Sequence, residues 1–509
     1  MGRIERRTFL KMTGGTVGAV VLSGLFYDQL LAGVLLDPAQ ELFAGKFGVT
    51  KEAMRKVLEA ALSKGGDFAD LFFEYRLANN VVMEDDIVRD SGENVNLGVG
   101  IRVLKDRQTG YAYTSDLSPE RMRQAALTAA AIASSGGSAG PAVLRRIEPG
   151  RQAYELAGPF ADAPLGDRIA LVKEAYAAAK DHDRRVSKVV ATLLDELQYV
   201  TIVNSEGLMV SDARPQARLV VAATAEENGK RVTGGKNAGG RVGTAYFRRP
   251  GTTPKELGVD AAREAVVLLS AAEPAPGEMP VVLGRFNSGV MVHEAVGHPL
   301  EGDANWKKSS IMWDRMGQMV ANPIVTIYDD ATIPQYRGSL NVDDEGTPTA
   351  KVTLIEDGKL VSYLHDRLSA RVLGVAPNGH GRRQGFANPP IPRMNNTVLA
   401  PGEASPEDIV RSVRKGFYAE SYAGGLVEGT GKFTFSVNLG YLIEDGRLTR
   451  PVKNATLIGT NVQILKEVEM IGNDLEYFLG SCGKAGQFVP VTAGTPTFKL
   501  RQMTVGGRS

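Results

Sequence analysis

The first half of the chain contains two combinations of the same kind: a segment with a helical pattern, followed by stretches with the alternating pattern of strands. Residues 51–63 repeat hydrophobic positions with the period of an amphipathic helix, and residues 165–180 are again helical in pattern. Each is followed by stretches in which hydrophobic and polar residues alternate, which is typical of strands with one buried face. These stretches are 70–77, 81–90, 95–105 and 109–115 in the first combination, and 187–212 and 217–235 in the second, where turns at 204–207 and 227–229 separate the strand-like runs. The pattern predicts two units, each with a helix and an antiparallel sheet.

Helix-start and linker signals divide the chain further. Ser118-Pro119 and Ser405-Pro406 each combine an N-cap residue with a proline at the first helical position, and residues 254–270 predict another helix. The stretches SSGGSAG (134–140) and AAEPAPGE (271–278) are typical of linkers. We expect an α+β fold: two helix-plus-antiparallel-sheet units, then a β-rich C-terminal domain. The expected segments are 1–44 (leader and linker), 45–140, 141–275 and 276–509.

The amino terminus has the features of an export signal. ERRTFLK, residues 5–11, is followed by a moderately apolar run over 12–26 that is too short to span a membrane. The motif closely resembles the twin-arginine signal, which directs export of folded proteins. We therefore expect a periplasmic or other extracytoplasmic protein, either released or tethered by this segment, because no tidy cleavage site follows it.

Composition excludes several classes of function. The formal net charge of +1 over 509 residues provides no bulk field for nucleic acid, so we expect no nucleic-acid partner. The single cysteine, Cys482, excludes an intrachain disulfide. A lone cysteine can be a buried small residue, a reactive nucleophile or a metal ligand, and composition alone does not decide among these three roles.

The stretch HEAVGHPLEGD, residues 293–303, carries the clearest chemistry. It places two of the chain's five histidines around a glutamate, a pattern that composition makes rare. Metallopeptidases with H-E-x-x-H use both histidines as zinc ligands and the glutamate as general base. Here one more residue separates His293 from His298, and residues five apart lie about 140° apart around a regular helix. A wide π-type turn next to Gly297 and Pro299 would restore a shared face.

A catalytic zinc ordinarily takes three protein ligands and a water. His293 and His298 supply two, and Glu294 is placed as base. The third ligand is Glu301, Asp303 or the distant Cys482; the position of Glu301 favours a supporting role, in which it orients a ligand.

These residues resemble the TldD/PmbA family, also called modulators of DNA gyrase, and specifically its metal-binding TldD branch. The likeness covers nearly everything after about residue 50. Besides HEAVGHPLEGD it includes GVGIRV (98–103), DDEGTP (343–348), GRRQGFANPPIPRMNNT (381–397) and SCGKAGQFVPVTAGTPTFKLRQMTVGG (481–507).

The resemblance implies a zinc-dependent peptidase for short or unfolded peptides, with one zinc ion per chain held by His293, His298 and Cys482, and with Glu294 as base. It also implies a dimer, either with a second copy or with a metal-free TldE/PmbA-type subunit. The alternatives are a non-catalytic assembly or binding subunit with structural zinc and a zinc amidase acting on cell-wall peptides. His380 is a candidate for lining the peptide cleft, with Arg382 and Arg383 as binders of a peptide carboxylate.

Overall fold

The computed structural model describes residues 42–133, 140–154, 156, 163–428 and 431–507. The predicted leader lies outside the described residues. In the part that is described, no helix has the length and apolar character needed to cross a membrane.

The α+β class is confirmed, and the strands of the two predicted units form one sheet. Within the described residues this sheet has seven strands in the order β3-β2-β1-β5-β6-β4, with β7 paired to β6. β1 joins the two units because it pairs with β5 along almost its whole length, from Asp70↔Asn204 to Glu84↔Val190. The strands are β1 Phe68–Glu84, β2 Ile87–Lys105, β3 Gln108–Thr114, β4 Arg145–Arg146, β5 Val186–Asn204, β6 Leu208–Glu227 and β7 Lys230–Gly240.

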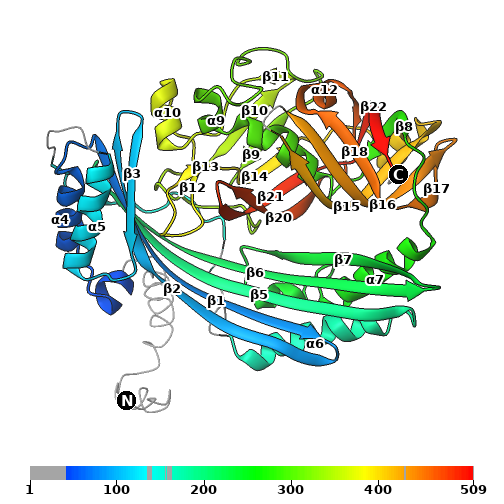
Figure 1. The fold of residues 1–509 in the computed structure, drawn as a ribbon, viewed down its shortest axis with the longest axis horizontal. Coiled ribbons are helices and arrows are strands. Elements are labelled where there is room, and N and C mark those ends of the chain that lie inside the picture. Colours follow the sequence, from blue (N-terminus) through cyan, green and yellow to red (C-terminus); the bar gives the residue numbers. More distant parts are fainter. Residues whose placement is uncertain (1–41, 134–139, 155, 157–162, 429–430, 508–509) are drawn as a thin grey trace, which may run out of the picture.

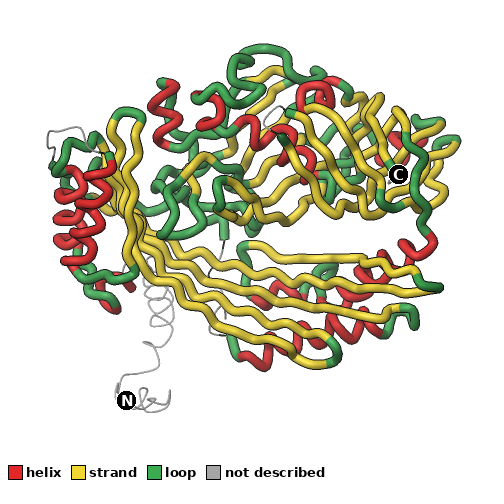
Figure 2. The backbone as a smooth tube through the Cα atoms, viewed as in Figure 1, coloured by secondary structure: helices red, strands yellow, loops and turns green. Residues whose placement is uncertain are grey.

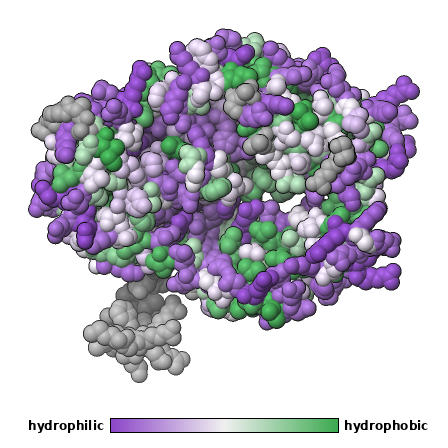
Figure 3. Space-filling view, viewed as in Figure 1, coloured by the Kyte–Doolittle hydropathy of each residue, from purple (hydrophilic) through white to green (hydrophobic). Residues whose placement is uncertain are grey.

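Two hydrophobic cores nevertheless lie along this sheet. Helices α4 (Lys51–Leu62) and α5 (Pro119–Ile132) pack with one end of β1 to β3, and α6 (Leu165–Lys180) and α7 (Pro254–Ser270) pack with β5 to β7. Figure 1 and Figure 2 show the long strands passing beneath the C-terminal domain, with α6 on the side of the sheet away from it. α7 packs on the same sheet and also reaches the C-terminal domain, because Ser421 and Asn438 donate to its Glu264. Hydrophilic residues cover most of the face in Figure 3.

The first sheet also shows where strand prediction was wrong. The stretch 81–90 is no separate strand, because Asp85 and Asp86 turn the chain between β1 and β2 with φ of 51° and 61°. Aspartate tolerates this left-handed conformation, which a tight hairpin turn requires. β1 and β2 therefore form one long hairpin.

The C-terminal domain contains two further sheets. In one, β15 pairs with both β8 and β16, so the sheet closes into a ring; its strands are β8 Gly277–Leu283, β15 Lys415–Val427, β16 Lys432–Glu444, β17 Arg447–Val452, β18 Ala455–Thr460, β19 Val468–Ile471 and β22 Phe498–Gly506. The other has the order β11-β10-β9-β14-β21-β20; its strands are β9 Ile327–Asp330, β10 Lys351–Glu356, β11 Lys359–Leu360, β14 Asn396–Leu399, β20 Glu476–Lys484 and β21 Gln487–Thr495.

Short elements connect these sheets: α8 Gly289–Val292, α9 Gly302–Trp306, α10 Arg367–Leu373, α11 Pro406–Arg411, α12 Asn461–Lys466, and the paired β12 Gly381–Arg382 and β13 Ile391–Pro392. The core between the two sheets contains Met291, Val292, Ala295 and Val296 from the segment HEAVGH and its preceding helix, together with Cys482 from β20. The C-terminal core therefore holds both ends of the predicted metal site.

Candidate metal centre

The two histidines of HEAVGH lie on a wide helical turn. α8 runs into a π-helical segment, His293–Gly297, which is followed by a short 3-10 turn, His298–Leu300. The backbone N–H of His298 donates to the carbonyl of His293, five residues back. Because this turn takes up the extra residue, the two imidazole rings lie close together, with centroids 5.1 Å apart. The wide turn predicted from the spacing is confirmed.

A glycine lets this turn pack against the core. A Cβ atom added to Gly297 would lie 1.7 Å from the sulfur of Met394, which is wholly buried between β13 and β14. No larger residue fits at position 297 unless Met394 moves. The glycine and the methionine therefore set the position of the turn together.

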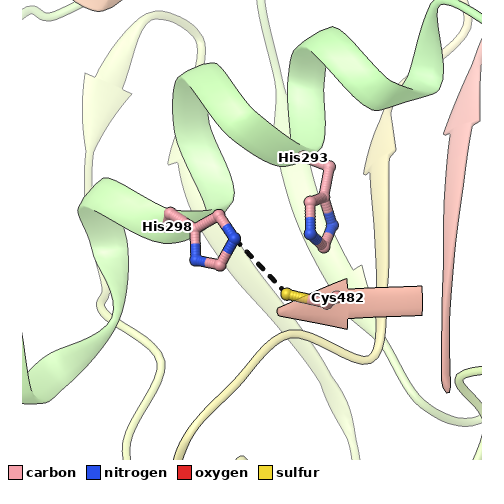
Figure 4. Close-up of side chains that lie close together, drawn as sticks. All are labelled: His293, His298 and Cys482. Carbon is pink, nitrogen blue, oxygen red and sulfur yellow. Dashed lines mark hydrogen bonds between the residues drawn. The ribbon is translucent and has the colours of Figure 1, made fainter. Parts of the chain in front are cut away.

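Cys482 lies beside both histidines although it is far from them in the sequence. It is on β20, paired with Val489 of β21, and is 3% exposed. Its Sγ lies 3.3 Å from Nε2 of His298, and the candidate ligand atoms of all three residues lie within 4.8 Å of one another. Figure 4 shows both imidazoles projecting from the helical segment toward the sulfur. Glu301 and Asp303, the rival third ligands, are not part of this group.

The cluster favours the ionised thiol. Burial alone would raise the pKa of Cys482, but the adjacent imidazoles of His293 and His298 outweigh burial and lower this pKa to about 4. Burial alone would lower the pKa of His298, and the carboxylate of Glu301 and the sulfur of Cys482 instead raise it well above its ordinary value. The thiolate is the form of cysteine that binds a metal, and these residues stabilise it next to a positive charge.

Glu301 contacts Nδ1 of His298, the ring nitrogen that does not face Cys482, and so fixes the orientation of the ring. Its Oε2 lies 3.0 Å from Nδ1 of His298 and 3.0 Å from Nζ of Lys484. Burial acts to raise the pKa of Glu301, but Lys484 and His298 outweigh burial and lower it to about 2. An ionised carboxylate only accepts, so Nδ1 carries a proton in either charge state of His298, and Nε2 is the nitrogen that can bind a metal once its own proton has left. Oδ1 of Asp303 accepts a hydrogen bond from Nζ of Lys484 at 2.6 Å. Asp303 therefore supports Lys484, which in turn pairs with Glu301.

Glu294 lies at the wall of a cavity next to the cluster. Its Oε2 is 3.9 Å from Nε2 of His298, and its side chain is 23% exposed. The cavity has a volume of about 540 Å³ and is lined by Glu294, His298, Pro299, Glu301, Ala304, Ser309, Ser310, Ile311, Gly425, Val427, Glu428, Gly431, Asn461, Gly483 and Lys484. Glu294 and His298 therefore line the same cavity, which borders the cluster at His298.

The residues of the cluster fit a divalent metal. Nδ1 of His293 is buried without a hydrogen-bond partner in the structure, although a buried ring nitrogen is ordinarily paired. Two imidazoles and a thiolate are a donor set that suits zinc, and three protein ligands leave one position of a tetrahedral site open. The described residues contain no fourth histidine, cysteine or carboxylate in the group.

The structure places His380, Arg382 and Arg383 in the interior, outside the lining of this cavity. His380 is wholly buried, with Nε2 3.1 Å from Asp329. Arg382 donates to the carbonyls of Met394 and Pro490, and Arg383 contacts Asp70 and Asp344. These side chains pair with buried backbone and carboxylate groups, and Arg383 joins the C-terminal domain to Asp70 of β1.

Sequence reasoning missed residues that the structure brings to the site. Arg393 and Lys484 stood within the motifs GRRQGFANPPIPRMNNT and SCGK, but no spacing rule assigned them a role. Asn461 stood in no motif at all. Their positions follow from strand pairing between distant segments, which a local pattern does not reveal.

A histidine pair on a helix with an adjacent glutamate is the arrangement found in metallopeptidases. The chain belongs to the PmbA/TldD family. Its residues 276–507, 158–269 and 69–133 match models described as the PmbA/TldA metallopeptidase C-terminal domain, central domain and domain 1.

Relatives of the chain in sequence are named as metalloproteases. "Metalloprotease TldD homolog" from Haemophilus influenzae is 38% identical over 467 residues, which cover 90% of this chain and 97% of that protein. "Metalloprotease" from Methanothermobacter thermautotrophicus is 32% identical over 451 residues, covering 87% of this chain and 96% of its own length. "Zinc metalloprotease TldD homolog" from Saccharolobus solfataricus is 32% identical over 240 residues, 47% of this chain and 54% of that protein.

Solved structures share the fold. A protein of Thermotoga maritima described as a modulator of DNA gyrase superposes with a TM-score of 0.74 at 24% identity, covering 90% of this chain and all of the other. TldE from Thermococcus kodakarensis superposes with a TM-score of 0.69 at 18% identity, covering 89% of this chain and all of the other.

Proposed function

We propose that the protein is a zinc-dependent peptidase for short or unfolded peptides, with Glu294 as general base. The position of Glu294 carries the proposal, because this carboxylate lines the cavity and lies 3.9 Å from a ring nitrogen of the cluster. Its neighbour His293 is a ligand, so the base and the metal approach the same water. A cavity of about 540 Å³ admits side chains and an extended main chain and excludes a folded domain.

Each residue of the site has a separate role in the proposed hydrolysis. Zinc, when bound to His293, His298 and Cys482, supplies Lewis acidity that activates a water and polarises the scissile carbonyl. Glu294 accepts the proton of the attacking water and returns it to the leaving amine. Glu301 keeps His298 in the tautomer whose Nε2 faces the cluster. A thiolate ligand donates more charge than imidazole does, so proton transfer by Glu294 carries more of the catalysis.

The proposal includes a second subunit and export. The fold shared with TldE supports pairing with a like-folded subunit, either a second copy or a metal-free relative. The twin-arginine segment ERRTFLK supports an extracytoplasmic location. Light scattering of the purified protein should give at least twice the chain mass, and cell fractionation should place it outside the cytoplasm; a monomeric, cytoplasmic protein would refute both parts.

Glu294→Gln tests the peptidase directly. The variant should keep about one zinc per chain, while hydrolysis of a mixture of short peptides falls by about 10² to 10⁴-fold, because the base is removed and the ligands are intact. Metal content by mass spectrometry and cleavage by chromatography are measured on the same preparation. Loss of zinc in the variant would make Glu294 a ligand, and a metal-loaded wild type that cleaves no peptide would favour the structural-zinc alternative.

A further inference from the structure

The side-chain amide of Asn461 is buried without a partner beside the catalytic cavity. Asn461 begins α12, is 0% exposed and lines the same cavity as Glu294 and His298. Both its Oδ1 and its Nδ2 are buried, and neither has a hydrogen-bond partner in the described structure. A buried donor and acceptor left unpaired destabilise a folded protein, so such a group requires a physical reason.

The position of Asn461 is fixed by its backbone, so its side chain is not needed to anchor the helix. The backbone N–H of Asn461 donates to the carbonyl of Gly431 at 2.9 Å. The residue at the N-cap of α12 is Thr460, and its side chain makes no capping bond. Leucine has nearly the shape of asparagine and would fill this space with no unpaired polar atom. Packing therefore does not explain the amide.

A glycine lies next to the amide at the cavity wall. Gly431 has φ of +84°, and a Cβ atom there would lie 3.1 Å from Cδ1 of Ile311 and 3.6 Å from Cγ of Asn461. A side chain at position 431 would start in contact with both residues, and the positive φ disfavours any residue other than glycine there. Other polar groups of the wall are already engaged: Ser310 Oγ donates to the Pro299 carbonyl, and Lys484 is paired with Asp303.

We propose that Asn461 binds the main chain of the peptide substrate, an inference that rests on the peptidase function proposed above. Nδ2 donates to a carbonyl of the substrate, and Oδ1 accepts from a substrate N–H. An asparagine amide presents a donor and an acceptor side by side, as an extended peptide main chain does. Recognition of this kind is independent of the substrate's side chains, and it selects secondary amides over ester or N-methylated linkages.

The test compares a peptide with analogues that lack one main-chain N–H. A short peptide that the wild type cleaves is prepared with an ester or N-methyl amide in place of each linkage outside the scissile one. For the analogue changed at one particular linkage, the wild type should show a kcat/KM about 10 to 100-fold lower than for the unmodified peptide, because Oδ1 of Asn461 loses its donor. In Asn461→Leu this penalty should disappear, since the variant makes no such bond. Gln463→Leu, an exposed change on the same helix, should keep the wild-type penalty.

Stability and metal content separate substrate binding from a structural role. Asn461→Leu should bind as much zinc as the wild type and unfold at an equal or higher urea concentration, because it no longer buries unpaired polar atoms. If this variant does not fold, Asn461→Ala takes its place in the same comparison. Equal penalties at every linkage in the wild type and the Asn461 variant would overturn the inference alone. A wild type that cleaves no peptide would overturn the proposed function and the inference with it.

Discussion

Arg393 contacts both chain segments that carry the metal ligands, although it offers no atom to the cluster. Its Nη2 donates to the carbonyl of Cys482 at 2.5 Å, and its Nε lies 3.7 Å from Oε1 of Glu301, the residue that holds His298. The side chain is wholly buried, so these interactions are little screened by solvent. The guanidinium therefore contacts both strand β20, through Cys482, and the segment after the wide turn, through Glu301.

Replacement of Arg393 should weaken metal binding with all three ligands present. Arg393→Met removes these interactions, and changes to groups that support metal ligands typically lower metal affinity by about 10 to 100-fold. Arg393→Lys keeps the charge and loses the planar fork, so an intermediate affinity is expected. Competition with a zinc-binding dye measures the affinity, and circular dichroism checks the fold. Unchanged affinity in folded Arg393→Met would contradict this role.

At the scale of elements, local signals predicted helices better than strands. The helices over 165–180 and 254–270 have the predicted bounds, because proline, capping residues and hydrophobic period all act within a few residues. The wide turn at His293–Gly297 was also predictable, since two histidines five apart share a face only on such a turn. The partner of Gly297 was not predictable, because Met394 reaches it from a loop about a hundred residues away.

The fit between Gly297 and Met394 can be measured with a double-mutant cycle. Gly297→Ala forces a methyl group onto the buried sulfur and should cost about 1–3 kcal/mol of unfolding free energy, and also weaken metal binding. Met394→Ala leaves a cavity and is destabilising by itself. Together the two changes should destabilise less than the sum of the single changes by about 1 kcal/mol or more, because the new methyl group occupies vacated space. Additive urea-denaturation results would show that the contact does not set the turn.

At the scale of the whole molecule, the two domains meet through buried charges. Nη2 of Arg102, in β2, lies 2.5 Å from Oδ2 of Asp70 in β1. Its Nη1 lies 2.6 Å from Oε1 of Glu345 in the C-terminal domain. Asp366 lies in the same region, and burial followed by the negative charge of Glu345 raises its pKa to about 7. The sequence motif DDEGTP contains Glu345, but its pairing with β2 depends on the assembled sheets and could not be predicted from the motif.

Asp366 should make stability depend on pH. Its pKa in the folded protein is above that of an unfolded aspartate, about 3.9. The protonated side chain therefore contributes stability that is complete below pH ~4 and is lost as the pH rises through about 7. Asp366→Asn keeps the cap on Ser369 of α10, removes the titration, and should show a shallower loss of unfolding free energy over this range. Urea titrations from pH 5 to 8 measure the slope, and identical slopes would contradict the assignment.

The most direct measurement is anomalous diffraction at the zinc absorption edge from crystals of the purified protein. The proposed peptidase requires one peak per chain, at about 2.0–2.1 Å from a nitrogen of His293 and of His298 and about 2.3 Å from Sγ of Cys482. No fourth protein ligand should contact it, and the open position should face Glu294 and the cavity. A peak closed by a fourth protein ligand, or a peak away from these three residues, would contradict the account.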